Sequence, residues 1–401
     1  MLPGYATAPV FRLSGALLSV GLAGLLAGCT TPPLQSARAE FYLGRFQQAN
    51  TNLTVIPKDD KDETLYLMER GMIRQNLGDY EASALDFRRA GELDRILETY
   101  SVAQGASSLM VNDRTLSFRG MPFERTLLYA FLAKDYLARS NWDYAAISAR
   151  NIIKHLENLN GFPDIAYGRY MAGFCLELIA DEGNAAIQYR AAARLLTNSI
   201  LLDALSGDIL PRTDEHSAAT SIARAALKTE PAELVCFIGL GRAPAGEFQQ
   251  YYYPGLPPYA EIYFGEEYLG RSYAFANTGA LMAQSRQRLA AIQMAKDATR
   301  IALKETISLT VENQNETLGA LVRLILFAME APDTRSWETL PLWLQIARVP
   351  CPANLTSYTV VFRDAAGGSL GRKVIREPLS RRGNIFISFC RDVGGPLTDS
   401  E

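Results

Sequence analysis

The sequence has little histidine and no excess of positive charge, and each shortage excludes a class of function. Only two histidines occur in 401 residues, His155 and His216, and neither has acidic or thiol neighbours at metal-ligand spacing. They give no support for histidine catalysis or a His-based metal site. Lys and Arg total 40 against 43 Asp and Glu, a net charge of −3. The chain thus lacks the basic excess with which nucleic-acid-binding proteins neutralise phosphates. We expect no nucleic acid, no metal and no cofactor.

Long hydrophobic runs are also scarce. Hydrophobic residues make up 48% of the chain and charged residues 21%, which excludes a multi-span membrane protein. The apolar stretch from Leu13 to Gly28 is shorter than the roughly 20 residues of a spanning helix. It follows a segment with one base, Arg12, and no acid, which is the layout of a signal peptide. We expect residues 1–28 to be a signal peptide, with an uncleaved anchor as the alternative.

The end of this stretch carries a second signal. The residues Leu26-Ala27-Gly28-Cys29 resemble the lipobox of bacterial lipoproteins. The resemblance implies cleavage before Cys29, attachment of lipid to its thiol, and anchoring of the mature chain to a membrane by acyl chains. Thr30 in place of an aspartate implies an outer-membrane location with the body in the periplasm. A Gram-positive surface protein, or a chance cysteine after an ordinary signal peptide, is the alternative.

Past the anchor, small and aromatic residues recur with a period of 34, the period of tetratricopeptide repeats. Small residues in that repeat let two antiparallel helices approach closely, and looser copies occur around Ala133 and Gly173. We expect four helix pairs near 31–60, 64–96, 123–156 and 163–197; unrelated amphipathic hairpins are the alternative. The aligned pairs are Ala37 with Gly71, Gly44 with Gly78, Phe46 with Tyr80, Ala49 with Ser83, and Leu53 with Phe87.

Two segments interrupt the helical pattern. Residues 100–121 have no apolar period of helical type and predict an inserted loop, which either contacts a partner or packs along the array as a spacer. A polar stretch over 205–232 predicts a linker that ends the repeat domain of residues 29–204.

The remaining residues, 233–401, predict a β-rich domain. Glu233–Leu240 is a compact apolar run with β-branched residues, which indicates a strand that leads into a turn. A helical insertion is expected over about 279–331, as helices at 279–309 and 315–331. Further strands are expected at Tyr259–Phe264, Trp343–Val349, Ser357–Arg363, Lys373–Arg376 and Asn384–Cys390. The predicted fold class is therefore α+β, an N-terminal tetratricopeptide-like α-helical solenoid followed by a small C-terminal β-rich domain with a helical insertion.

Two segments and the lipobox together resemble a known family. The segments are Ala331–Pro341 (APDTRSWETLP), followed by ARVP at 347–350, and Leu109–Glu124 (LMVNDRTLSFRGMPFE). They are similar to a family of uncharacterised proteobacterial tetratricopeptide lipoproteins, over most of the mature chain. The resemblance implies genes near those for activator lipoproteins of peptidoglycan-synthesising penicillin-binding proteins, and hence a role in the cell envelope.

The repeat numbering selects candidate binding residues. First-helix side chains of stacked hairpins line a concave groove, and an adaptable apolar lining suits a peptide or helix. The alternative is that the chain's own C-terminal part fills the groove. The groove residues are Met68, Met72, Leu127, Lys134, Tyr170 and Phe174. Arg335 and Trp337 are either a binding surface or a buried cap, in which Trp337 packs under the β domain and Arg335 binds backbone carbonyls.

The sequence lacks the usual catalytic motifs. Gly239-x-Gly241 follows a predicted strand, but the third glycine is misplaced for a dinucleotide fingerprint. We therefore expect a non-catalytic scaffold in the periplasm, anchored to the outer membrane, whose partner is an envelope protein or peptide. The alternatives are a glycan-processing enzyme with two facing carboxylates and a subunit of an envelope export machine. Four cysteines remain beside Cys29; a Cys351–Cys390 bond is one outcome, and four free thiols is the outcome that we favour.

Overall fold

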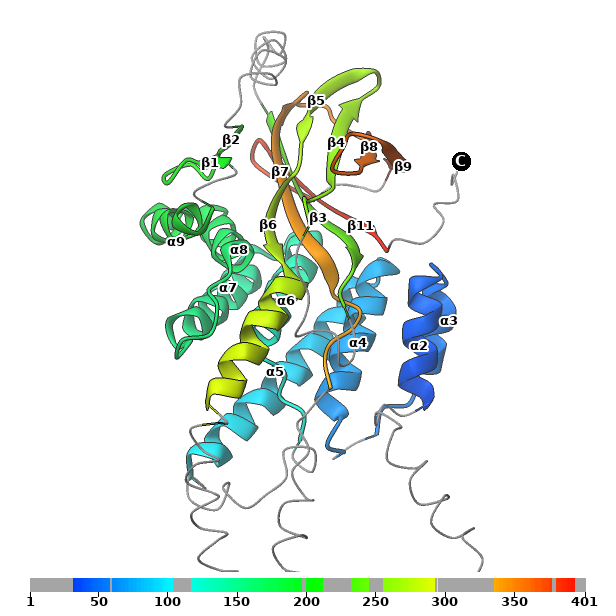
Figure 1. The fold of residues 1–401 in the computed structure, drawn as a ribbon. Coiled ribbons are helices and arrows are strands. Elements are labelled where there is room, and N and C mark those ends of the chain that lie inside the picture. Colours follow the sequence, from blue (N-terminus) through cyan, green and yellow to red (C-terminus); the bar gives the residue numbers. More distant parts are fainter. Residues whose placement is uncertain are drawn as a thin grey trace, which may run out of the picture.

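The computed structural model describes residues 32–57, 60–103, 117–196, 200–211, 232–244, 255–292, 294, 335–376 and 380–393. The expected signal peptide, Cys29 and the helix at 315–331 lie outside these residues. The described chain is a mixed α+β fold, with helices in the N-terminal half and sheets in the C-terminal part (Figure 1).

The N-terminal half forms four helical hairpins, at the positions that the sequence predicts. In each hairpin two consecutive helices pack against each other, and each hairpin also packs against the next. The hairpins are α2 (Pro32–Tyr42) with α3 (Phe46–Asn52), α4 (Glu63–Asn76) with α5 (Tyr80–Ala103), α6 (Pro122–Ala138) with α7 (Trp142–Glu157), and α8 (Ala166–Glu177) with α9 (Glu182–Leu195). Helix α5 extends to Ala103, so the prediction that the loop begins at residue 100 is wrong.

All four hairpins turn in the same way. The turn residue has a positive φ in each, 75° at Gly44, 80° at Gly78, 55° at Ser140 and 61° at Ala180. The next residue donates its N–H to a carbonyl five residues back, for example Asp79 N to Arg74 O at 3.0 Å. This pair of features is the Schellman motif, which satisfies the last carbonyls of a helix and reverses the chain. The four turns lie seven residues after Ala37, Gly71, Ala133 and Gly173.

The small residues of the first helices lie where aromatic rings of the second helices come close. A Cβ built on Gly71 would lie 2.6 Å from Cε1 of Phe87, and one on Gly173 would lie 2.9 Å from Cδ1 of Tyr189. Glycine thus allows each ring to pack directly on the backbone of the facing helix. The sequence predicts this close approach correctly.

The C-terminal part forms two sheets that pack face to face. The larger sheet has the order β10-β11-β3-β7-β6, in which only β11 and β3 run parallel, and the smaller has the order β5-β4-β8-β9. A hairpin of β1 (Ile200–Leu202) and β2 (Ile209–Pro211) follows α9. The other strands are β3 (Ala232–Arg242), β4 (Tyr259–Phe264), β5 (Glu267–Arg271), β6 (Tyr273–Asn277), β7 (Pro341–Cys351), β8 (Tyr358–Arg363), β9 (Ser369–Ile375), β10 (Ser380–Arg382) and β11 (Ile385–Asp392).

Strand β3 is buried on both faces and divides two hydrophobic cores. Leu234, Cys236 and Ile238 face the smaller sheet, whereas Val235 and Phe237 belong to the core that contains the helices. A strand covered on both sides is expected to be continuously apolar. This explains why Glu233–Leu240 stands out in the sequence.

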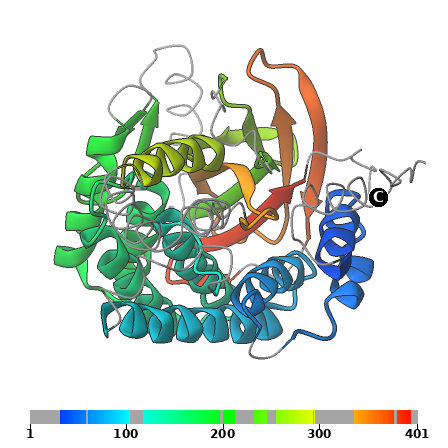
Figure 2. The same ribbon diagram turned by 60° about the horizontal axis from the view of Figure 1, so that its bottom comes forward.

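The helices curve around the larger sheet. Figure 2 shows them following an arc from α2 and α3 (blue) to α8 and α9 (green), with strands inside the arc. A further helix over 278–292 begins after β6, where Asn277 Oδ1 accepts the N–H of Ala280 at 2.8 Å as an N-cap. No helix in the described part of the chain is long and apolar enough to cross a membrane.

The four described cysteines are free and buried. Cys351 lies opposite Ala232 and Cys390 opposite Ile238 on the same strand, β3. Six residues of strand separate these partners, which corresponds to roughly 20 Å. A bond between Cys351 and Cys390 requires Cα atoms within about 7 Å and is therefore excluded.

Candidate functional site

The predicted groove residues are buried in the core. Met68, Met72, Leu127, Tyr170 and Phe174 are almost fully buried, and Lys134 is 8% exposed. They therefore do not form an open groove in this structure. Of the two alternatives posed by the sequence, the chain's own C-terminal part covers these side chains.

Aromatic side chains of the larger sheet fill one end of the concave face. Phe237 of β3 lies 5.5 Å from Phe174 and 6.4 Å from Tyr170, between ring centroids. Phe275 of β6 lies 5.0 Å from Tyr170 in an edge-to-face arrangement. Such pairs add to the stability gained by apolar burial, so helix α8 and the sheet form one packed unit.

Residues 335–340, which we call the strap, cross the other end of the concave face before β7 begins. The Trp337 ring is buried between Phe87 of α5 and Phe131 of α6, with centroid distances of 5.7 and 5.5 Å. Its indole N–H donates to Thr339 Oγ1 at 3.0 Å. Arg335 pairs with the carboxylate of Asp62. Both side chains thus fasten the strap; Trp337 is buried, as the cap alternative proposes, but its ring contacts lie on helices α5 and α6.

Buried carboxylates of the first helices hold the backbone of the strap. Glu69 of α4 accepts the N–H groups of Glu338 at 2.9 Å and Thr339 at 3.2 Å. Glu124 of α6 accepts the N–H of Trp337 at 2.7 Å. Hydrogen bonds to ionised acceptors are stronger than neutral ones. The first helices therefore hold the extended backbone of residues 337–339 through buried carboxylates.

Arg38 of α2 completes this arrangement from the other side. Its guanidinium contacts Glu69 at 2.6 Å and Glu338 at 2.8 Å, and donates to Ser336 O at 2.7 Å. The Tyr42 hydroxyl donates to Glu338 O. Burial raises the Tyr42 pKa to about 12, so the phenol stays protonated and donates at neutral pH.

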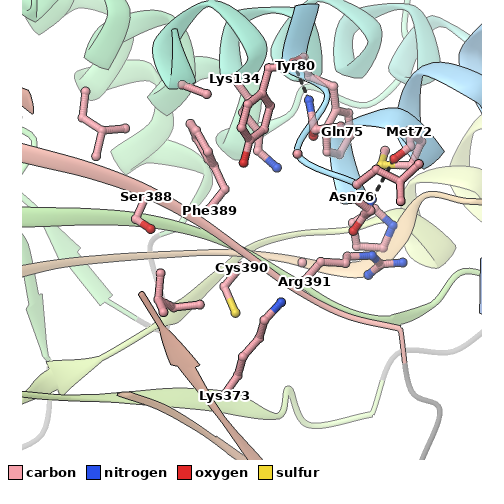
Figure 3. A pocket seen from close by; sticks show the side chains of 18 of the residues that line it. Met72, Gln75, Asn76, Tyr80, Lys134, Lys373, Ser388, Phe389, Cys390 and Arg391 are labelled. Carbon is pink, nitrogen blue, oxygen red and sulfur yellow. Dashed lines mark hydrogen bonds between the residues drawn. The ribbon is translucent and has the colours of Figure 1, made fainter. Parts of the chain in front are cut away.

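A cavity of about 640 Å³ lies beside the strap, along β11. Figure 3 shows Lys134 and Tyr80 on the helix side of β11 and Lys373 on the opposite side. Within the described chain, its lining includes four cations and no Asp or Glu. The cations are Lys134, Lys373, Arg376 and Arg391; aromatic side chains in the lining are Tyr80, Phe131, Tyr167 and Phe389.

Lys134 is the most unusual side chain of the cavity. Its ammonium lies 4.9 Å from the Phe131 ring centroid and 5.1 Å from that of Phe389. In the described chain, no carboxylate or hydrogen-bond acceptor contacts it. Burial lowers the pKa of Lys134 to about 8, helped by Arg391 and opposed by Asp135.

Asp135, the residue next to Lys134 in the sequence, is hydrogen-bonded to another side chain. Asp135 Oδ1 accepts a hydrogen bond from Gln75 Nε2 at 2.7 Å. Burial raises the pKa of Asp135 well above its usual value. Asp135 thus hydrogen-bonds to Gln75, and its effect on Lys134 only partly offsets that of burial.

Sequence reasoning found Lys134 but missed Arg391, Glu69 and Glu124. The two glutamates lie among apolar residues of first helices, and a charged side chain on a buried helix face signals a specific partner. That signal identifies the helix side of the contact but not the strap. The sequence gives no comparable signal for Arg391. Its neighbours depend on the pairing of β11 with β3, which lies far away in the sequence.

Comparison with known proteins adds no family: no family model matches the chain, and no curated protein gives a significant match. No cluster of His, Cys, Asp or Glu suited to a metal ion occurs among the residues that the structure describes. The geometry thus offers two features to interpret, the helical array closed by its strap and the cationic cavity.

Proposed function

We propose that the chain is a lipid-anchored lipoprotein of the outer membrane that acts as a non-catalytic scaffold for other proteins of the cell envelope. The lipobox-like ending at Cys29 supports the anchor. The resemblance to tetratricopeptide lipoproteins supports an envelope role linked to peptidoglycan synthesis. Because the strap and the larger sheet occupy the concave face, the partner is proposed to dock on the outer helices.

The repeated hairpin geometry supports a tetratricopeptide-type array. The four turns share one Schellman geometry, at equal distance from Ala37, Gly71, Ala133 and Gly173. Ala49, Ser83, Ala145 and Ala185, each twelve residues after those positions, are all buried. Equivalent positions therefore make equivalent contacts, as stacked repeats require.

One observation carries the docking proposal: an exposed aliphatic side chain recurs at the same repeat position on three successive second helices. Leu85 of α5, Ile147 of α7 and Ile187 of α9 are 51%, 49% and 53% exposed. Each lies fourteen residues after the small residue of its hairpin. Single exposed apolar residues are ordinary, but here three recur at one repeat position. We call Leu85, Ile147 and Ile187 the outer row.

The docking proposal is tested by photo-crosslinking in cells. A photoreactive amino acid is placed at Leu85, Ile147 or Ile187, and crosslinked proteins are identified by mass spectrometry, with proteins of peptidoglycan synthesis examined first. Leu370 of β9, which is 51% exposed, is the matched control. We expect one shared partner at all three outer-row positions and not at Leu370. The same products at Leu370, or none at the row, would refute the docking face.

The anchor is tested separately. Cys29→Ser should abolish incorporation of labelled palmitate and release the protein from the membrane, because the thiol is the proposed acceptor. Thr30→Asp is the matched variant, since it should keep the label and change the membrane in which the protein is found. Labelling of Cys29→Ser would contradict the lipobox interpretation without bearing on the outer row.

A further inference from the structure

We propose that the cavity along β11 is a binding site for a small polyanion, a phosphate-bearing or polycarboxylate molecule, whose charged group binds Lys134 and Arg391. The scaffold proposal does not require this site, and the site does not require the scaffold.

The first argument is the charge of the lining. The described lining combines Lys134, Lys373, Arg376 and Arg391 with no carboxylate. Cations that share a partly enclosed space repel one another, and low-dielectric walls strengthen that repulsion. A bound anion with two or more charges would neutralise them, whereas a neutral ligand would not.

The second argument is the state of Lys134. The side chain is more than nine-tenths buried, and its ammonium meets only the faces of Phe131 and Phe389 in the described chain. A buried charge is costly unless it is paired and hydrogen-bonded, and no described residue accepts a hydrogen bond from this ammonium, which lines the cavity. With a pKa of about 8 the group is still mainly charged at neutral pH. Its position predicts an anionic partner in the adjoining space.

Arg391 supplies a second cation without a counter-ion on the same side of β11. Its Nη1 donates to the carbonyls of Gly241 at 3.0 Å and Asp392 at 3.2 Å, its Nη2 donates to the carbonyl of Thr339 at 3.5 Å, and its Nε has no partner among the described residues. No carboxylate lies within ion-pair distance of the guanidinium in the described chain. The planar guanidinium suits a phosphate or carboxylate group.

The shape of the sheet leaves room for such a ligand. Strand β10 pairs only with Ile385–Ile387, so the edge of β11 beyond Ile387 has no neighbouring strand in the described chain. The cavity follows this edge, and the exposed Lys373 and Arg376 lie at its solvent side. A volume of about 640 Å³ falls in the range of small-molecule sites. The aromatic lining provides contacts for an uncharged part of the ligand.

The site is tested by isothermal titration calorimetry on the mature full chain in a non-ionic detergent, without phosphate buffers. The probes are inorganic pyrophosphate and citrate, which represent the two ligand chemistries, and uncharged sucrose is the negative control. The variants are Lys134→Met within the cavity and Lys373→Met at its solvent side. Lys154→Met, an exposed lysine of α7, is the matched control because it removes the same charge elsewhere.

We expect at least one anionic probe to bind and sucrose not to bind. Lys134→Met should weaken that binding by about 10-fold or more, the effect of losing a charge-assisted hydrogen bond. Lys373→Met should weaken binding by about 2- to 5-fold, because the anion loses the electrostatic attraction of Lys373. The effect should be larger at low salt than at high salt. Lys154→Met should bind like the wild type. Binding by pyrophosphate alone or citrate alone identifies the ligand chemistry.

The proposal is overturned if neither anion binds, or if Lys134→Met and Lys154→Met bind equally well. Lys373 is exposed on an edge strand, so a loss of binding in Lys373→Met does not reflect unfolding. Crosslinking at the outer row is expected to be unchanged in these variants, which separates the failure of this site from the failure of the scaffold.

Discussion

Lys134 shows how one side chain links stability with the proposed binding. The apolar first helix α6 buries this lysine beside Phe131 and Phe389, where methionine would pack without a charge. The pKa falls from 10.5 to about 8 on folding because burial disfavours the ammonium. Proteins tolerate such a cost mainly where a site requires it.

We predict that Lys134→Met stabilises the protein at pH 7 by about 3 kcal/mol, the free energy that corresponds to a pKa lowered from 10.5 to about 8. Between pH 8 and 10.5 the unfolded wild type binds more protons at this lysine than the folded one. Wild-type stability therefore rises with pH across that window relative to the variant. Urea unfolding at pH 7, 9 and 10.5 should show the difference shrinking towards zero; a constant difference would contradict the lowered pKa.

Gly71 tests the close packing inside a hairpin. Gly71→Ala would place a methyl group 2.6 Å from Cε1 of Phe87, whose ring is held by Phe131 and Trp337. We predict a loss of about 1 to 3 kcal/mol from overpacking. Gly183→Ala in α9 is the control, since its Cβ meets nothing within 4 Å, and it should gain about 0.5 to 1 kcal/mol from helix propensity. Equal unfolding midpoints for the two variants would argue against the contact.

At the scale of elements, the strap fastens the helical hairpins to the sheet. Trp337 fills a pocket between α5 and α6, while carboxylates of α4 and α6 hold the adjacent backbone. We predict that Trp337→Ala lowers the free energy of unfolding by about 3 to 5 kcal/mol. Trp142→Ala is the matched control: Trp142 is only half-buried at the start of α7, and its loss should cost clearly less. Similar losses in chemical denaturation would refute the fastening role.

Local patterns predict many of these elements correctly. The turns at Gly44 and Gly78 follow from glycine and the 34-residue period, and strands β3, β4, β7, β8 and β11 follow from apolar runs. Strands β5 and β6 were missed because they are short and Gly270-Arg271 separates their apolar residues. Local patterns also cannot show that β11 pairs in parallel with β3, because that pairing joins distant parts of the sequence.

At the scale of the whole molecule, helices and sheet share one core. The cluster that contains Met68 and Tyr170 also contains Phe237, Trp337 and Ile387. The helical half alone would expose this surface. We predict that residues 29–196 expressed alone keep the far-ultraviolet circular dichroism of helices. They should lose the near-ultraviolet signal and the cooperative urea unfolding, as molten globules do. The full mature chain is the control; a cooperative transition in the fragment would show that the array folds independently.

The candidate sites were predictable only in part, because they form where the helices and the C-terminal part of the chain pack together. The repeat numbering selects Lys134 and the aromatic residues of α8, but whether the concave face is open depends on where residues 335–393 pack. Arg391 and Lys134 line the same cavity only because of the tertiary fold. The outer row was not selected from the sequence either, because the repeat period alone does not show which positions are exposed, and the first hairpin has Thr51 at this position.

The parallel pairing of β11 with β3 has a consequence for the order in which the protein assembles. Ile385 lies opposite Glu233, so the central strand of the larger sheet gains its second neighbour only after nearly the whole chain has been made. Contacts of such long sequence separation carry a large loop-closure cost and slow folding. A chain delivered from its N-terminus would leave Tyr80 and Lys134 of the hairpins without their contact to Phe389 until the last strand arrives. We therefore expect maturation to be limited by a late docking step, during which the unfinished protein depends on chaperones and is most open to proteases.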